Sequence, residues 1–153
     1  MAYPEDVINI AELETKDLLL QQPPFVMIDR MLMTDESRSV SQLTVRDNHM
    51  YYEAETATLS ENALMENIAQ TAAARLCYIA KYVLKKNVTL GFIGAIRNFQ
   101  LYRKPELGET MTTTINIVCD AMSMLLVEAD ICVGDEKIVE TEMKMTTSDL
   151  PCN

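Results

Sequence analysis

Residues 58–86, TLSENALMENIAQTAAARLCYIAKYVLKK, form the stretch that decides the fold of this chain. They include neither Gly nor Pro, so no residue in the stretch interrupts a helix. Thr58 and Glu61 have the spacing of a capping box, and Ser60 is an alternative N-cap. Two lysines close the last turn, where positive charge suits the helix dipole. The stretch therefore predicts one long helix.

The first half of the predicted helix has almost no polar face. Apolar residues occur there on nearly all sides, at Ala63, Leu64, Met65, Ile68, Ala69, Ala72 and Ala73. A helix with this pattern is usually buried on most of its surface. At about 1.5 Å per residue it is roughly 40 Å long, enough to cross a small domain. We expect the other elements to pack around it.

Candidate strands occur on both sides of this helix. Before it, residues 24–35 and 39–45 are apolar or alternating runs, joined by a turn at residues 35–37. Residues 1–22 are expected to form a lead-in with a short helix, and residues 148–153 a tail. After the helix, four further runs are typical of strands, at residues 88–105, 111–120, 122–133 and 137–147, with a hairpin turn at Gly134.

This order of elements predicts a single α+β domain over residues 1–153. A curved antiparallel sheet would wrap around the long central helix, which buries one face of the sheet. The sheet would keep an open edge, and an open edge favours pairing with a second subunit. The expected assembly is therefore a dimer.

The composition argues against several classes of function. The net charge of −10 at pH 7 disfavours binding to nucleic acid or to an anionic membrane surface. We expect neither a secretion leader nor a membrane span, because no segment has the apolar pattern of either. The cysteines lack the paired spacing of a disulfide framework, which is typical of a reduced, cytoplasmic protein. With a single histidine, no metal site and no cofactor are expected.

Glu66 does not fit the burial of the predicted helix. Gln70 follows four residues later and therefore lies on the same face. Burying a carboxylate is costly unless it is paired or has a function. Glu66 either lies at a solvated edge or pairs with a cation such as Arg75, or it stands in an apolar cleft as an acid–base group.

Three motifs in this order resemble those of the hotdog-fold 3-hydroxyacyl-acyl-carrier-protein dehydratases. The first is QPPFVMIDR at residues 22–30, and the second is LMENIAQ at residues 64–70, in which an acidic residue precedes Ala-Gln. The third is GFIGAIRNF at residues 91–99, followed by Arg103-Lys104-Pro105 and Gly108. The resemblance spans residues 18 to 147, which is most of the chain.

The resemblance implies a hotdog fold, a dimer with a continuous sheet, and an acyl tunnel at the dimer interface. It also implies a mechanism that needs two residues. A histidine of one subunit removes the α-proton of a 3-hydroxyacyl thioester, and an acidic residue on the partner's helix assists departure of the hydroxyl group as water. Glu66 matches the acidic position of the motif. The implied partner is acyl carrier protein or coenzyme A, which carries the thioester.

The sequence departs from the family pattern at the histidine, because the Phe-Pro pair and Pro-Gly turn that follow it there are absent. A gapless alignment from Glu66 places Tyr52 at that position, and His49 is the only histidine of the chain. His49 is the natural base, since an unperturbed imidazole titrates near neutrality. Alternatively, it is a loop histidine without a role. Tyr52 either donates a hydrogen bond to a substrate carbonyl or packs at the tunnel mouth.

Other positions carry alternative interpretations. Gln70 either orients Glu66 or packs as a helix amide, and Gly91 and Phe92 either line the thioester arm with their backbone or form a bulge. Asp29 and Arg30 are expected to form a structural ion pair or a strand-end contact. A cationic rim would attract an acidic carrier protein, or its members are ordinary solvated charges: Lys81, Lys85, Lys86, Arg97, Arg103 and Lys104.

Three functions follow from these observations. The first is a dehydratase-like enzyme in fatty-acid, polyketide or polyene-type lipid synthesis, with Glu66 as the general acid and His49 as the base. The second is a hotdog acyl-thioesterase, which uses a helix carboxylate and needs no histidine. The third is a non-catalytic hotdog subunit that binds acyl chains or pairs with an active homologue as a heterodimer.

Overall fold

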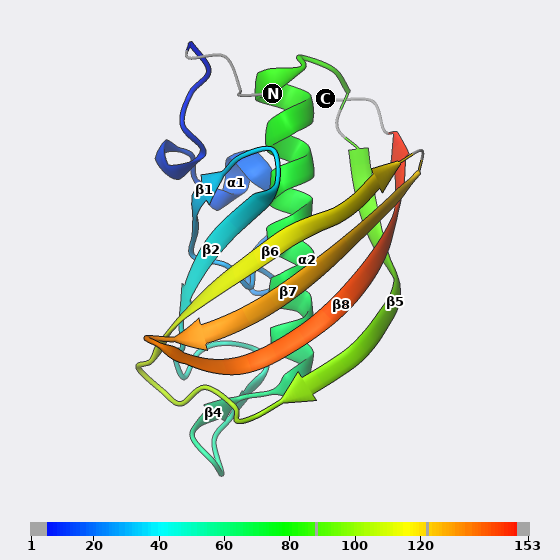
Figure 1. Cartoon of the computed structure of the whole chain (residues 1–153). Helices are drawn as coiled ribbons and strands as arrows, with labels where there is room; N and C mark the ends of the chain where they lie inside the picture. Colours follow the sequence, from blue (N-terminus) through cyan, green and yellow to red (C-terminus); the bar gives the residue numbers. More distant parts are fainter. Residues whose placement is uncertain (1–5, 88, 122, 150–153) are drawn as a thin grey trace.

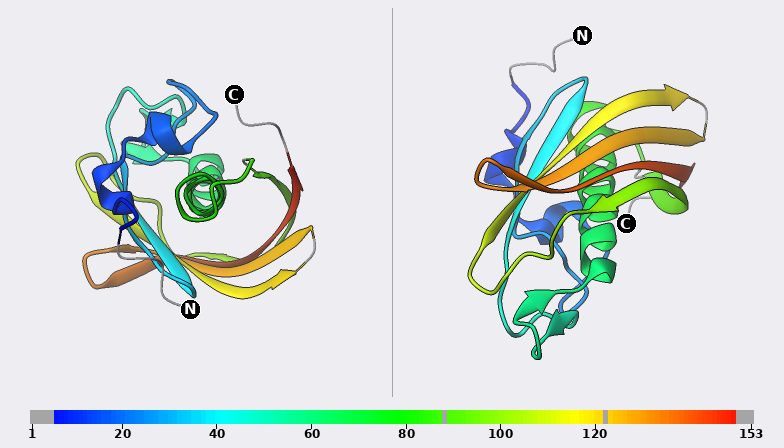
Figure 2. Two further views of the ribbon diagram at one scale, coloured as in Figure 1. Left: turned by 90° about the horizontal axis from the view of Figure 1, so that it is seen from above. Right: turned by 60° about the horizontal axis from the view of Figure 1, so that its bottom comes forward.

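The computed structural model describes residues 6–87, 89–121 and 123–149, with the backbone alone for residues 89–92, 148 and 149. A six-stranded antiparallel sheet curves around one long helix (Figures 1 and 2). The strand order is β1-β2-β6-β7-β8-β5, so the first strand after the helix lies at an edge beside the last strand. The strands are β1 (Arg30–Thr34), β2 (Arg38–Thr44), β5 (Thr89–Leu101), β6 (Thr110–Ala121), β7 (Met124–Val133) and β8 (Glu136–Asp149).

The central helix is α2 (Glu61–Tyr78), which continues as a π-helical segment, η2 (Ile79–Val83). Of the two predicted N-caps, Ser60 is confirmed and Thr58 was wrong, because Thr58 belongs to a short strand, β4 (Thr58–Leu59), that pairs with β3 (Tyr52–Glu53). The predicted C-terminal end was also wrong. At the other end, Lys85 has a φ of 52°, outside the helical region, so the chain has already left the helix there.

The main hydrophobic core lies between α2 and the concave face of the sheet. Along β2 and β6 buried and partly buried residues alternate, as expected when one face of a sheet is covered. Each large apolar side chain buried here contributes about 1.5–3 kcal/mol to folding. The principal members are Leu43, Leu64, Ile68, Met111, Ile115, Val127, Ile131 and Met143. The predicted curved sheet around a central helix, an α+β fold, is confirmed.

A second apolar cluster covers the side of α2 that faces away from the sheet. The N-terminal segment supplies it, with two short helical turns, η1 (Ile10–Glu12) and α1 (Thr15–Leu18), in place of one lead-in helix. Figure 2 shows this segment on the side of α2 opposite the sheet. The Tyr78 hydroxyl donates to the Ile8 carbonyl at 2.9 Å and fastens the segment to the helix. The two clusters explain why α2 is apolar on nearly all sides.

Two strand predictions needed correction. The run at residues 24–35 forms a strand only over Arg30–Thr34, and the part before it is a loop that binds α2. At the other end, β8 extends to Asp149, so the tail begins later than expected. The hairpin turn at Gly134 is confirmed, and its φ of 60° suits glycine.

Candidate active site

The loop before β1 is bound to α2 by two buried amide side chains. Gln70 accepts a hydrogen bond from the Met27 N–H through Oε1 at 2.7 Å, and its Nε2 donates to the Phe25 carbonyl at 2.8 Å. Asn67 donates through Nδ2 to the Met27 carbonyl, also at 2.7 Å. Gln70 and Asn67 are 1% and 0% exposed, so these bonds are shielded from water. The two amide side chains therefore provide hydrogen-bond partners for backbone groups of Phe25 and Met27, which a neighbouring strand would otherwise have to provide.

The same Gln70 also holds the carboxylate of Glu66. Its Nε2 donates to Glu66 Oε1 at 2.9 Å in addition to the Phe25 carbonyl. Glu66 is partly buried, and this bond fixes one of its two oxygens. Of the two interpretations of Gln70, orientation of Glu66 agrees with this geometry.

Arg75 is not the partner of Glu66. Nine residues along an α-helix place two side chains on opposite sides of it. Arg75 is buried and donates to the turn between β1 and β2, at the Asp35, Glu36 and Arg38 carbonyls. The Arg75 guanidinium therefore stabilises the turn between β1 and β2, whereas Glu66 is hydrogen bonded to Gln70.

Hydrogen-bonded polar side chains continue from the loop before β1 into the core. Thr113 of β6 donates to Asn67 Oδ1 at 2.6 Å, and Thr71 hydrogen bonds to Ser41 of β2 at 2.7 Å. These groups satisfy one another inside an otherwise apolar core, which makes the register of α2 against the sheet specific. Sequence reasoning did not single out Asn67, although it adjoins Glu66 in the LMENIAQ motif.

His49 follows β2 in the segment that leads to the central helix. Its Nε2 lies 3.2 Å from the Thr44 carbonyl oxygen, and the ring is partly buried. A carbonyl oxygen only accepts hydrogen bonds, so this contact needs a proton on Nε2, and a neutral ring then keeps its lone pair on Nδ1. The neutral ring in this orientation has its proton-accepting nitrogen away from Thr44.

Asp29 forms an ion pair near His49, and its partner is Arg46. The two guanidinium nitrogens of Arg46 contact the two carboxylate oxygens of Asp29 at 2.9 Å each. The expectation that Asp29 pairs with Arg30 was therefore wrong. The alternative expectation, a structural contact at a strand end, agrees with the hydrogen bond from the Thr44 N–H to Asp29 Oδ2 at 2.9 Å.

Tyr52 lies beside the start of α2. It pairs with Leu59 in the small β3–β4 hairpin, and its side chain packs against the main core. The neighbouring Ser60 is the N-cap of α2, but its side chain makes no capping bond. Within the described part of the chain, Ser60 Oγ is buried and has no hydrogen-bond partner. Sequence analysis considered Ser60 only as a cap.

The backbone of Gly91 and Phe92 lies in β5, opposite Thr147 and Thr146 of β8. Their register is regular, and the bulge of this strand lies further on, between Ile93 and Ala95. The alternative of a bulge at Gly91 was therefore wrong. What surrounds their side chains lies outside the described residues.

Two of the six residues of the predicted cationic rim pair with acidic side chains of the protein itself. Arg103 binds both carboxylate oxygens of Glu109, at 2.7 and 2.9 Å, and also contacts Glu136. Hydrogen bonds from Arg103 hold the pKa of Glu109 below its usual value, against the opposing effect of burial. Lys104 pairs with Glu53 at 3.0 Å, so these cations bind the protein's own carboxylates.

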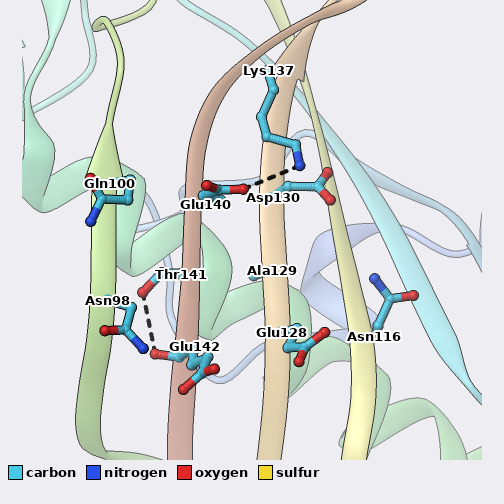
Figure 3. Close-up of a pocket in the computed structure, with 10 residues that line it drawn as sticks. All are labelled: Asn98, Gln100, Asn116, Glu128, Ala129, Asp130, Lys137, Glu140, Thr141 and Glu142. Carbon is cyan, nitrogen blue, oxygen red and sulfur yellow. Dashed lines mark hydrogen bonds and ion pairs between the residues drawn. The ribbon is translucent and has the colours of Figure 1, made fainter.

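A hollow of about 280 Å³ lies on the outer face of the sheet. Figure 3 shows its side chains on β5 to β8, with Glu128 and Glu142 on adjacent strands and Asp130 beside Glu140. The hollow is polar and none of its lining residues belongs to α2, so it is separate from Glu66. Among the described residues, no group of three or more His, Cys, Asp or Glu side chains is placed to bind a metal ion. None of the helices in this part of the chain has the length and apolar character of a membrane span.

The curved sheet around a helix that carries an acid–amide pair defines a hotdog-fold protein. Residues 13–151 match the sequence model of the ApeP-like family, described as ApeP dehydratase. The chain belongs to the ApeP-like dehydratase family.

Similar proteins agree with this family. The chain is 23% identical over 150 residues to the 3-hydroxyacyl-[acyl-carrier-protein] dehydratase FabZ of Desulfotalea psychrophila, covering 94% of this chain and 99% of that protein. It is 25% identical over 115 residues to an uncharacterized thioester dehydrase of Halalkalibacterium halodurans, covering 74% and 72% of the two chains.

Solved structures confirm the hotdog fold. The dehydratase heterocomplex ApeI:P of Xenorhabdus doucetiae has a TM-score of 0.83 at 15% identity, over 90% of this chain and 92% of that chain. A hypothetical thioesterase of Streptococcus pneumoniae with coenzyme A has a TM-score of 0.64 at 9% identity, over 80% and 88% of the chains. At these identities the likeness shows the fold alone.

Proposed function

We propose that the protein is a cytoplasmic dehydratase that removes water from a 3-hydroxyacyl thioester carried by acyl carrier protein. Its setting would be fatty-acid, polyketide or polyene-type lipid synthesis. The observation that carries the proposal is the Glu66 carboxylate held by Gln70 on the central helix, in a chain of a dehydratase family. The amide fixes one carboxylate oxygen and leaves the other available to a substrate hydroxyl group.

The proposed reaction needs an acid and a base. His49, through Nδ1, accepts the proton from the α-carbon, and the electron pair of that C–H bond forms the double bond. The bond from the β-carbon to the hydroxyl oxygen breaks, and protonated Glu66 donates its proton so that water leaves. Acid and base return to their starting states when the proton passes from His49 to Glu66 through solvent. In a dimer, His49 and Glu66 of one site would come from different subunits.

Tyr52, Gly91 and Phe92 are proposed to contact the substrate. Tyr52 lies in β3, beside the start of α2, where its hydroxyl would donate to the thioester carbonyl. The β5 backbone would lie along the thioester arm. Ser60 Oγ, buried and without a partner among the described residues, is a further hydroxyl group at this end of the helix. We propose no metal and no cofactor for the reaction, since it needs only proton transfer.

The test is turnover of a 3-hydroxyacyl thioester by the purified protein, with enoyl absorbance and free thiol followed together. We expect Glu66→Gln to lower kcat by about 10²–10⁴-fold, the usual contribution of a general acid. Glu61→Gln, an exposed position in the first turn of α2, is the matched control and should leave kcat unchanged. Undiminished turnover in Glu66→Gln would remove Glu66 from the mechanism. Thiol release without enoyl product would identify a thioesterase.

A second candidate function is that of a subunit paired with an active homologue. It is favoured by the structural likeness to a dehydratase heterocomplex. Under this proposal the homodimer or higher homo-oligomer is inactive, and the chain forms a heterodimer with a second hotdog subunit. Enoyl product formed by the purified chain alone would exclude it. Activity that appears only after the second subunit is added would support it.

A further inference from the structure

The end of β2 is held by several contacts that converge on three consecutive residues. Asp29 Oδ2 accepts the Thr44 N–H at 2.9 Å, and the Asp29 carboxylate also binds Arg46 through two hydrogen bonds. The Val45 N–H donates to the Glu109 carbonyl at 2.8 Å. Such charge-assisted, bidentate contacts fix geometry more strongly than single neutral ones. The direction of the Thr44 carbonyl is therefore set by its neighbours.

His49 is attached to this held segment at two points. Its N–H lies 3.4 Å from the Arg46 carbonyl, which closes the turn over residues 46–49. Its ring nitrogen Nε2 lies 3.2 Å from the Thr44 carbonyl. The side chain of Arg46 thus binds Asp29. The backbone carbonyl of Arg46 closes the turn that positions the His49 ring. A continuous chain of contacts runs from Asp29 through Thr44 and Arg46 to the imidazole.

We propose that Asp29 and Arg46 are positioning residues for His49. They hold the Thr44 carbonyl as the acceptor of Nε2–H, so that Nδ1 is the ring nitrogen free to take a proton. The catalytic part rests on the proposed dehydratase function, whereas the tautomer is a property of the protein itself. The ion pair alone contributes little to stability, because the Arg46 side chain is 49% exposed.

The single histidine makes the tautomer directly measurable. In ¹⁵N-labelled protein at a pH where the ring is neutral, a long-range ¹H–¹⁵N correlation spectrum contains one imidazole system and distinguishes N–H from bare nitrogen. We expect wild type to show Nε2–H as the only tautomer. Arg46→Met and Asp29→Leu should each show a population of the Nδ1–H form. Lys137→Met removes an exposed ion pair with Glu140 within β8 and is the control, expected to keep the wild-type spectrum.

Several outcomes would overturn the proposal. They are an Nδ1–H tautomer in wild type, an unchanged tautomer in Arg46→Met, or an equal change in Lys137→Met. If Asp29→Leu does not fold, Arg46→Met decides, since it leaves the Asp29–Thr44 bond in place. The measurement needs no substrate, so it gives its answer even where turnover is absent. Where enoyl product forms, Arg46→Met should lower kcat about tenfold with KM unchanged, and an unchanged kcat would overturn the catalytic part.

Discussion

At the scale of single residues, Gln70 makes three hydrogen bonds that join the loop before β1 to the carboxylate of Glu66. Its side-chain amide binds the loop at Phe25 and Met27 and also the carboxylate of Glu66. Because one amide serves all three, the position of the acid depends on the position of the loop. Buried amides are costly when a partner is missing, so this arrangement is sensitive to substitution.

Gln70→Leu should both destabilise the fold and lower turnover. The change leaves the Met27 N–H and the Phe25 carbonyl without their partner, at a cost of about 2–4 kcal/mol in the free energy of unfolding. Urea unfolding measures this cost, and the enoyl assay measures kcat. Gln100→Leu, on an exposed part of β5, is the matched control with an expected change below about 0.5 kcal/mol. Equal stability of the two variants would contradict the role of Gln70.

At the scale of elements, an ion-pair cluster ties the β5–β6 connection to the β7–β8 hairpin. Arg103, just after β5, binds Glu109 before β6 and Glu136 at the start of β8. The side chains of Arg103 and Glu109 are 30% and 26% exposed, so solvent screens the pair only in part. The cluster therefore fastens the end of the sheet nearest the β3–β4 hairpin.

This cluster predicts a dependence of stability on pH. The pKa of Glu109 is depressed in the folded protein, chiefly by the hydrogen bonds from Arg103. Its contribution is therefore complete above the pKa of an unfolded glutamate, about 4.3, and is lost as the pH falls through the lower folded value. Glu109→Gln should cost about 1 kcal/mol at neutral pH, and the difference from wild type should shrink toward about pH 3. Urea unfolding at both pH values measures it, with exposed Glu106→Gln as the control. A pH-independent difference would contradict the assignment.

At the scale of the whole molecule, α2 is enclosed by two layers of different origin. The sheet covers one side with the main core, and the N-terminal segment covers the other with a smaller cluster. Within the described residues, β5 has a strand partner only on the β8 side, so a long strand ends the sheet. An unpaired edge of this length favours pairing with a second subunit.

We expect the protein to form a dimer through β5, despite its net charge of −10. Ile93 of β5 is 42% exposed near this edge, so Ile93→Asp should convert the dimer to a monomer. Light scattering after size-exclusion chromatography measures the mass. Val118→Asp is the control, because Val118 is 52% exposed on β6, which lies inside the sheet and away from the β5 edge. A dimer that persists in Ile93→Asp but dissociates in Val118→Asp would place the interface elsewhere.

The sequence alone determined the elements whose signals are local. The periodicity of residues 61–78 predicts a buried helix, and alternation with turn residues predicts the strands after it, including the turn at Gly134. The acid–amide spacing of Glu66 and Gln70 also lies within one helix, so their hydrogen bond followed from helical geometry. These features depend on neighbours a few residues apart, which a single sequence contains.

The tertiary structure decided what depends on distant partners. Asp29 binds Arg46 instead of adjacent Arg30, and the apolar run around Met27 leaves the sheet because amides on α2 take its backbone hydrogen bonds. Arg75 closes a hairpin turn about forty residues earlier in the chain, and His49 turns its Nε2 toward Thr44. Such contacts depend on which surfaces meet after folding. Local sequence patterns do not show which distant residues come into contact, because the packing of the whole chain around α2 decides it.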